Sequence, residues 1–329
     1  MNNEKIRWGI LGAGRIANKF CTALVSTPGA VLYAVASRNV TSGKPFSIKY
    51  SAVKYYDNYL ELVSDPNVDI IYIATPHIFH YEQVRLCLEN NKSVLCEKPI
   101  GVSYLQTQQM IELATQKKLF LMEGMWTACM PFIKKIKEII QDGIIGTIAN
   151  VQADLGFTAQ NNPEDRLLNK ALAGGSILDV GVYPISLATL LLGRPSAIKS
   201  VSALTETGVD AYSNIILQYP NGATAQLLSS LIFETPKEVV IMGTKGLIRV
   251  DSPWYMATDF SVQLEDGTEK TYHLPHPNNG FEFEISEVMN CLKDKLLESV
   301  LVPHSQTLIV SEIMDELLFQ AGVNYDEPL

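Results

Sequence analysis

Lys98, Asp179 and Tyr183 are the side chains best suited to moving a proton in this sequence of 329 residues. Lys98 lies in the segment Glu97-Lys98-Pro99, directly after an apolar run, and the proline keeps Lys98 extended. An ammonium group there could hydrogen-bond a hydroxyl, or lower the pKa of a neighbouring phenol from ~10 toward neutrality. The alternative is that Glu97 and Lys98 form an ordinary ion pair at the surface.

Two glycines, Gly174 and Gly175, open a predicted helix that carries an acid and a phenol. Asp179 and Tyr183 are four residues apart, so they share one face of that helix. The glycines let the helix start approach another backbone or a ligand closely. The carboxylate, the phenol and the lysine could then form one acid–base cluster. The alternative is that Asp179 caps the first turn and that Tyr183 is a buried aromatic residue.

A glycine turn near the N-terminus predicts a phosphate-binding site. The apolar run from Ile6 to Leu11 meets the sequence Gly-Ala-Gly-Arg-Ile, and an amphipathic stretch follows. Glycine suits such a turn because a side chain would keep the backbone amides from a pyrophosphate, and the next helix offers its positive N-terminus to the phosphates. The expected ligand is a nicotinamide dinucleotide. Its predicted contacts in this turn are Gly12, Gly14, Arg15 and Ile16.

The end of the second predicted strand favours NADP over NAD. An NAD site usually places an acidic residue there for the ribose 2′-hydroxyl, whereas this sequence has Ser37 and Arg38. A guanidinium suits a 2′-phosphate. The alternative is that Arg38 is a solvated residue at a strand end. Glu97 and Lys98 complete the charged residues that we expect at the cofactor, at the edge where the nicotinamide should lie.

These residues follow the strands of a predicted α/β domain with a doubly wound parallel sheet, a Rossmann domain over residues 1–124. Apolar runs rich in β-formers alternate with helical patterns in this region. Ligands of such sheets gather at the carboxyl ends of the strands. The predicted strands are Ile6–Leu11, Ala30–Ala36, Ile70–Ala74, Ser93–Cys96 and Leu119–Glu123, and the predicted helices are Ile16–Leu24, Phe46–Tyr50, Asn58–Val63, Tyr81–Glu89 and Ser103–Gln116.

Residues 125–329 are predicted to form an α+β domain with a large, mostly antiparallel open sheet. After a helix over Met130–Gln141, strand-like stretches cover most of Thr147–Leu274. Apolar and polar residues alternate there, so one face of the sheet should be covered and the other moderately polar. Helices are predicted over Phe281–Leu297 and Ser305–Ala321, and we expect the C-terminal helix to pack back on the first domain.

Composition favours a small-molecule partner. The formal net charge of −9 and the pI near 5.1 argue against nucleic acid and anionic membranes as partners. The five cysteines are widely scattered, which indicates reduced thiols and a cytoplasmic location. We expect no signal peptide and no apolar run of membrane-spanning length.

The motifs together resemble the family of glucose-fructose oxidoreductase, inositol dehydrogenase and rhizopine-catabolism proteins (Gfo/Idh/MocA). The resemblance covers nearly the whole chain and rests on Gly9-Ile-Leu-Gly12-Ala-Gly14-Arg-Ile-Ala17, Ala74-Thr75-Pro76, Glu97-Lys98-Pro99 and Gly174-Gly175 to Tyr183. Several members have histidine where this chain has Tyr183. The tyrosine and the segment EGMWTACMP are more similar to the branch of dimeric dihydrodiol dehydrogenase and NADP-linked xylose dehydrogenase. That branch usually has an arginine where this chain has Ala128, which puts one cofactor or substrate contact in doubt.

The resemblance implies roles for the candidate residues. Tyr183 would donate or accept the proton, Lys98 would activate it and bind the reacting oxygen, and Asp179 would orient the substrate. Further cofactor contacts would come from Thr75, Pro76 and His80, and aromatic substrate contacts from Trp126 and Phe157. Arg166, in the loop before the glycine pair, is a candidate lid or substrate contact, or else a solvated charge. The family also implies a homodimer through the C-terminal sheet, whose uncovered face needs a partner.

The predicted function is NADP-dependent hydride transfer to or from a sugar, a polyol or a cyclic trans-diol. A dinucleotide-occupied sensor without turnover is the alternative from another class, and an NAD-dependent sugar dehydrogenase of the histidine type is a third. We expect no metal, because His77 and His80 have no third ligand nearby beyond Glu82 and this chemistry does not require one.

Overall fold

The computed structural model describes residues 5–325, which divide into two compact units. The first unit comprises 5–101, 105–126 and 277–304, and the second comprises 102–104, 127–276 and 305–325. The division after residue 126 lies close to the boundary expected after residue 124. The segment 277–304, which contains one of the two C-terminal helices, groups with the first unit.

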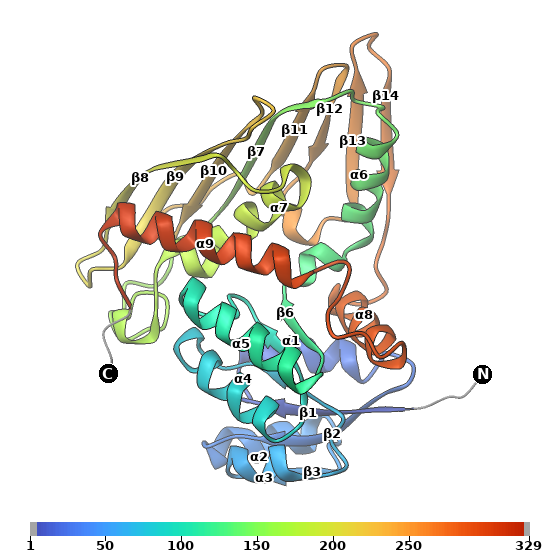
Figure 1. Cartoon of the computed structure of the whole chain (residues 1–329), viewed down its shortest axis with the longest axis vertical. Coiled ribbons are helices and arrows are strands. Elements are labelled where there is room, and N and C mark those ends of the chain that lie inside the picture. Colours follow the sequence, from blue (N-terminus) through green and yellow to red (C-terminus); the bar gives the residue numbers. More distant parts are fainter. Residues whose placement is uncertain (1–4, 326–329) are drawn as a thin grey trace. The chain divides into compact units, whose positions relative to one another are not determined.

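The first unit contains the predicted parallel sheet (Figure 1). Its order is β3-β2-β1-β4-β5-β6, so the direction of winding reverses between β1 and β4, where such sheets bind their ligands. The strands are almost continuously apolar because both faces are covered; all four residues of β4 are buried. The strands are β1 Ile6–Leu11, β2 Ala30–Ala36, β3 Lys54–Tyr56, β4 Ile70–Ile73, β5 Ser93–Glu97 and β6 Leu121–Gly124.

The helices of the first unit match the predicted crossovers except at their ends. The largest difference is α2, which starts at Val40 instead of Phe46, because the Asn39 side chain accepts the Thr41 N–H at 3.0 Å and so caps the helix. No predicted range covers β3, a strand of three residues. The helices are α1 Arg15–Leu24, α2 Val40–Lys49, α3 Tyr59–Ser64, η1 His77–Phe79, α4 His80–Glu89, α5 Tyr104–Lys117 and α8 Phe281–Lys293.

The second unit is built on a sheet of order β14-β13-β12-β11-β7-β10-β9-β8. β7 and β10 pair in parallel and the other neighbours pair antiparallel, which confirms the mostly antiparallel sheet. The strands are β7 Ile148–Gly156, β8 Ala197–Leu204, β9 Asp210–Gln218, β10 Thr224–Ser230, β11 Val239–Gly243, β12 Gly246–Val250, β13 Asp259–Leu264 and β14 Glu269–His273.

One face of this sheet is covered by α7, which packs over β7 and β10 (Figure 1). Val151 and Ala225 are fully buried beneath it, as the alternation predicted. Gln320 of α9 bonds the backbone of β8 at Ser200 and Ile198 and so covers part of that edge strand. The helices are η2 Trp126–Cys129, α6 Pro131–Gln141, η3 Lys170–Leu172, the π-helix η4 Ile177–Gly181, α7 Val182–Leu192, η5 Trp254–Met256 and α9 His304–Ala321.

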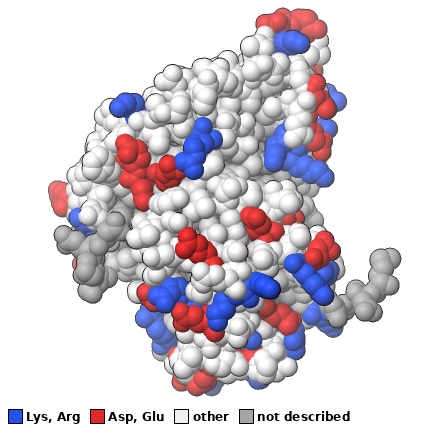
Figure 2. All heavy atoms as spheres, in the orientation of Figure 1, with Lys and Arg blue, Asp and Glu red and all other residues white. Residues whose placement is uncertain are grey.

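One expectation about apolar runs needs correction. The helical segment Lys170–Leu192 is long and apolar enough to cross a membrane, with a mean hydropathy of 1.6 in its most apolar window. However, 78% of that window is buried inside the protein, as in the core helix of a globular domain. Charges on the face drawn in Figure 2 are intermixed, and neither sign forms a broad patch among the residues coloured there.

Candidate active site

The glycine turn of the first unit has the shape that a dinucleotide requires. Gly12 has a φ of +99°, and a Cβ there would lie 3.0 Å from the Ala74 carbonyl oxygen and 3.1 Å from Thr75 Cγ2. The turn therefore packs against the end of β4, and only glycine fits. At Gly14 the nearest atom to a Cβ is 3.9 Å away, so the start of α1 is open. The N–H groups of that helix start could hold a pyrophosphate, beside exposed Arg15 and half-buried Ile16.

Arg38 is held by two aromatic rings that sequence reasoning missed. Its guanidinium carbon lies 5.1 Å from the ring centre of Phe79 and 5.7 Å from that of Tyr59. Cation–π contacts of this kind restrict an otherwise exposed arginine. Ser37 is buried, and its hydroxyl accepts the Asn39 N–H at 3.3 Å. Arg38 is thus an exposed cation with a defined orientation at the end of β2.

The segment after β4 is tied to the one that carries Lys98. The ring nitrogens of His80 lie 2.9 Å from the Thr75 carbonyl oxygen and 2.8 Å from the Pro99 carbonyl oxygen. His80 is fully buried, and this burial lowers its pKa against the opposing effect of the two carbonyls. His80 therefore fixes the ends of β4 and β5 relative to each other. Pro76, which follows β4, is half-buried. A direct contact of His80 with the cofactor stays a prediction.

Glu97 lies inside the first unit. It is 5% exposed and accepts a short hydrogen bond from the Tyr72 hydroxyl. Burial, and then the charge of Glu97, raises the pKa of Tyr72 well above its usual value, so the phenol stays protonated and donates. Glu97 is therefore not part of a surface ion pair, which was the alternative that the sequence left open. Lys98 follows it at the strand end and is half-buried.

Trp126 belongs to a column of stacked rings in the first unit. It is 6% exposed and stacks on Phe281 of α8 with 4.8 Å between ring centres. Phe281 meets Phe20 of α1 edge to face at 6.1 Å, and Phe20 stacks on Tyr72 at 3.7 Å. The column fixes the position of Trp126, which lies just after β6. It also packs α8 against α1. Its role as a substrate contact stays a prediction.

In the second unit the structure brings two predicted substrate residues together. Arg166 Nη1 lies 2.8 Å from Asp179 Oδ1, and the Asp179 side chain is only 8% exposed. The glycine pair makes this possible, because a Cβ on Gly174 would lie 2.6 Å from the Leu167 carbonyl oxygen. The prediction that the glycines admit another backbone is confirmed. The guanidinium of Arg166 thus compensates the charge of a nearly buried carboxylate.

Tyr183 lies at the start of α7 in an aromatic and apolar surrounding. It is half-buried and packs against the cluster that contains Leu155, Leu168 and Leu231, together with Phe157. Its ring centre is 5.9 Å from that of Tyr255, a neighbour that no motif indicated because it lies in a short turn after β12. The helix start itself is a π-helix, where the sequence predicted an α-helix; π-turns are frequent at functional sites.

Two family models match this chain. One is described as "Oxidoreductase family, NAD-binding Rossmann fold" and matches residues 6–125, and the other, "GFO/IDH/MocA C-terminal domain", matches residues 133–249. The chain belongs to the GFO/IDH/MocA oxidoreductase family. This confirms the family resemblance and the two-sheet fold that the motifs predicted.

Full-length relatives agree with this family. A trans-1,2-dihydrobenzene-1,2-diol dehydrogenase of Xenopus tropicalis is 34% identical over 331 residues, which cover 97% of this chain and 99% of the relative. A D-xylose 1-dehydrogenase (NADP(+)) of Hypocrea jecorina is 35% identical over 370 residues, covering 99% and 94%. This GFO/IDH/MocA chain is an NAD(P)-dependent oxidoreductase acting on CH–OH groups.

Solved structures share the fold. An aldose-aldose oxidoreductase of Caulobacter crescentus, complexed with glycerol, is similar with a TM-score of 0.88 and 25% identity over 97% of this chain and 98% of that one. A 3-ketoreductase of Actinomadura kijaniata in complex with NADP and TDP-benzene has a TM-score of 0.83 at 23% identity, over 94% and 96%, and supports the fold alone.

Within residues 5–325, no three His, Cys, Asp or Glu side chains come together in a group that could hold a metal. The two histidines that raised the question, His77 and His80, have ring centres 5.9 Å apart, and both nitrogens of His80 face backbone carbonyls.

Proposed function

We propose that this oxidoreductase transfers a hydride between NADP(H) and a carbinol or carbonyl carbon of a sugar, a polyol or a cyclic trans-diol. The observation that supports it most directly is the Arg166–Asp179 pair, which places a nearly buried carboxylate one turn before Tyr183. A carboxylate and a phenol on one helix suit a substrate with neighbouring hydroxyl groups. The names of the full-length relatives, a diol dehydrogenase and a xylose dehydrogenase, agree with that class.

The proposed cofactor residues are those of the first unit, because their geometry fits a dinucleotide. The glycine turn and the open start of α1 would hold the pyrophosphate, Ser37 and Arg38 the ribose phosphate, and the segments after β4 and β5 the rest. The nicotinamide, when bound, supplies or accepts the hydride. The protein then has to orient the substrate, exclude water and manage one proton.

We assign the proton to Tyr183 and its activation to Lys98. The ammonium of Lys98 would bind the reacting oxygen and favour the ionised phenol, and the Asp179 carboxylate would orient the substrate. Trp126 and Phe157 would contribute aromatic surface to the substrate. Lys98 and Trp126 belong to the first unit, and Asp179, Tyr183 and Phe157 belong to the second.

An absorbance assay of the reduced nicotinamide tests this proposal. NADP and NAD are compared in parallel over aldopentoses, aldohexoses, inositols and cyclic diols. We expect turnover of at least one class, with NADP giving the higher kcat/KM. Tight NADPH binding without turnover of any substrate would contradict the proposal and favour a dinucleotide-bound sensor. A preference for NAD would contradict the cofactor assignment alone.

Arg38→Ala should reverse the cofactor preference. Loss of the guanidinium removes the partner of the 2′-phosphate, so kcat/KM with NADP should fall by about 10²-fold while that with NAD changes by less than about 3-fold. Exposed Arg194→Ala is the matched control and should leave both values unchanged. Equal losses with the two cofactors would show that Arg38 does not read the 2′-phosphate.

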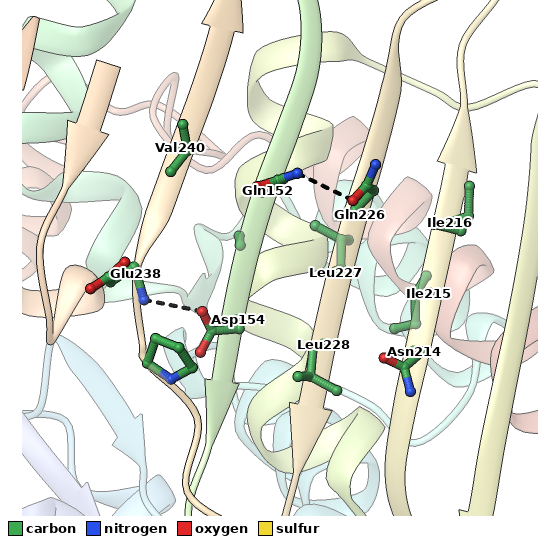
Figure 3. A pocket seen from close by; sticks show the side chains of 12 residues that line it. Gln152, Asp154, Asn214, Ile215, Ile216, Gln226, Leu227, Leu228, Glu238 and Val240 are labelled. Atoms are coloured by element: carbon green, nitrogen blue, oxygen red, sulfur yellow. Dashed lines mark hydrogen bonds between the residues drawn. The ribbon is translucent and has the colours of Figure 1, made fainter. Parts of the chain in front are cut away.

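We also propose that the chain forms a homodimer through the uncovered face of the C-terminal sheet. β7, β9, β10 and β11 present a hollow of about 420 Å³ on this face (Figure 3). Gln152 donates to Gln226 at 3.2 Å across it, and Ile216 is 46% exposed. A broad sheet face with mixed amide and apolar side chains suits a second copy of itself, because a twofold axis makes each contact between two different residues occur twice.

Ile216→Glu should break this dimer. A charge on this face would be buried in the interface without a partner, so the variant should sediment as a monomer at micromolar concentration where the wild type sediments as a dimer. Ile48→Glu, at a 71% exposed isoleucine of α2, is the matched control and should remain a dimer. A monomeric wild type would contradict the proposal without affecting the catalytic one.

A cytoplasmic location completes the proposal. All five cysteines are buried thiols outside any disulfide bond, as in proteins of reducing compartments.

A further inference from the structure

A buried carboxylate outside the proposed active site bonds to the start of the helix that carries Asp179 and Tyr183. Asp210, the first residue of β9, is fully buried. Its Oδ2 accepts hydrogen bonds from the Ser176 hydroxyl and from the Ile177 N–H, both at 2.7 Å. Ile177 opens the π-helix that carries Asp179 and leads into Tyr183. The sequence alternative was that Asp179 caps the first turn of the helix. In the structure Asp210 accepts the first N–H of that turn.

Two more hydroxyl groups complete this arrangement. The hydroxyls of Ser176 and Ser229 lie 2.9 Å apart, which ties the helix start to β10. The Tyr325 hydroxyl, close to the C-terminus, donates a short hydrogen bond to the Gly174 carbonyl oxygen. Burial raises the pKa of Tyr325, and the charge of Asp210 raises it further, so this phenol stays neutral and donates.

Side chains pack closely around the glycine pair, so no residue with a Cβ fits at Gly175. Gly175 has a φ of +122°, and a Cβ there would lie 2.2 Å from Asp210 Oδ1 and 3.0 Å from the Tyr325 hydroxyl oxygen. Asp210 Oδ1 accepts no hydrogen bond from any residue within the described part of the chain. A buried carboxylate oxygen without a hydrogen-bond donor lowers the free energy of unfolding. Proteins keep such unfavourable groups mainly at functional sites.

We propose that Asp210, Ser176, Ser229 and Tyr325 form a buried clamp that positions the helix carrying Asp179 and Tyr183 for the reaction, an inference that rests on the proposed function. Asp210 and Tyr325 are positioning residues in this arrangement, because they act through the helix start. Two charge-assisted bonds to one oxygen fix the first turn, and the C-terminal segment closes the glycine pair from the other side.

Ionisation of Asp210 adds a pH dependence to the clamp. Burial raises the pKa of Asp210 to about 6, although its hydrogen bonds to Ser176 and Ile177 oppose this. The titratable side chain that the charge of Asp210 affects is the Tyr325 phenol, which stays neutral. Below pH 6 the carboxyl is protonated and accepts less strongly, so the helix start should loosen and kcat should fall.

Asp210→Asn tests the clamp because it keeps the shape of the side chain and removes its charge. We expect kcat to fall by about 10-fold at pH 7.5, NADPH affinity to change by less than about 2-fold, and the limb of the kcat profile near pH 6 to disappear. Amide hydrogen exchange over 174–183 should become faster. Wild-type kcat, an unchanged limb and unchanged exchange would overturn the proposal.

Tyr325→Phe gives an independent test with a matched control. It removes one hydrogen bond near the C-terminus, and we expect kcat to fall by about 3-fold and exchange over 174–183 to rise. Tyr219→Phe removes a buried hydroxyl that has no partner within residues 5–325, so both readouts should stay at wild-type values. If Asp210→Asn does not fold, wild-type behaviour of Tyr325→Phe alone overturns the clamp.

The exchange measurement also separates this inference from the proposed function. If the wild type turns over no substrate, the proposed function fails. In that case faster exchange over 174–183 in Asp210→Asn still supports the clamp, and unchanged exchange refutes it.

Discussion

Lys98→Ala should abolish turnover of the best substrate of the panel while leaving NADPH bound. We expect kcat to fall by about 10³-fold, within the range that positioned acid–base groups contribute, and the Kd for NADPH to change by less than about 3-fold. The reason is chemical. The ammonium is proposed to meet the reacting oxygen and to favour the ionised Tyr183, and a methyl group does neither. The glycine turn and Arg38, which would hold the dinucleotide, are not altered by this change.

Two further variants sharpen the Lys98 experiment. Lys98→Met keeps the apolar stem and removes the charge, so it should lose as much activity as Lys98→Ala. Exposed Lys117→Ala, in the last turn of α5, should behave as the wild type. If Lys98→Met retained more than about a tenth of wild-type kcat, the ammonium would not be essential and its assignment would be wrong.

Tyr183→Phe should lower kcat by about 10²- to 10³-fold with a small change in KM. The phenol is proposed to carry the proton in the transition state, and phenylalanine keeps the ring that packs beside Phe157 and Tyr255. The readout specific to a proton carrier is the pH profile of kcat/KM. The wild type should show a limb from the activated phenol, and Tyr183→Phe should lack it.

The double variant Lys98→Ala/Tyr183→Phe tells whether the two residues serve one proton. If Lys98 acts by activating Tyr183, the double variant should be little slower than Lys98→Ala alone, because residues that act as a unit are not additive. Additive losses would mean that they act separately. Unchanged turnover in Tyr183→Phe, measured beside the Tyr219→Phe control, would refute the acid–base assignment of Tyr183.

Much of the cofactor domain could be predicted because its signals are local. An apolar strand, a glycine turn and an amphipathic helix follow one another within Ile6–Leu24, and the structure has them as β1 and α1. The alternation of strands and helices predicted a parallel, doubly wound sheet, and the structure has one. Short elements gave the weakest signal. β3 has three residues, and the true start of α2 depends on one side-chain cap at Asn39.

The site of the second unit was only partly visible in the sequence. The glycine pair, Asp179 and Tyr183 stand close together in the chain, so their spacing drew attention to them. Tyr255 escaped notice because it is distant in sequence and lies in a turn without a pattern. The same holds in the first unit for Phe79 and Tyr59, which hold Arg38 from two different segments.

By itself, the sequence determined the family, the two-sheet fold, the dinucleotide turn and the candidate residues Lys98, Asp179 and Tyr183, because these depend on periodicity and on residues that are neighbours in the chain. Only the tertiary structure decided which groups meet. Arg166 reaches Asp179 from 13 residues away because Gly174 admits its backbone. Asp210 caps the helix start from 33 residues away because β9 begins there. Such contacts join residues that are distant in the sequence, and no local pattern encodes them.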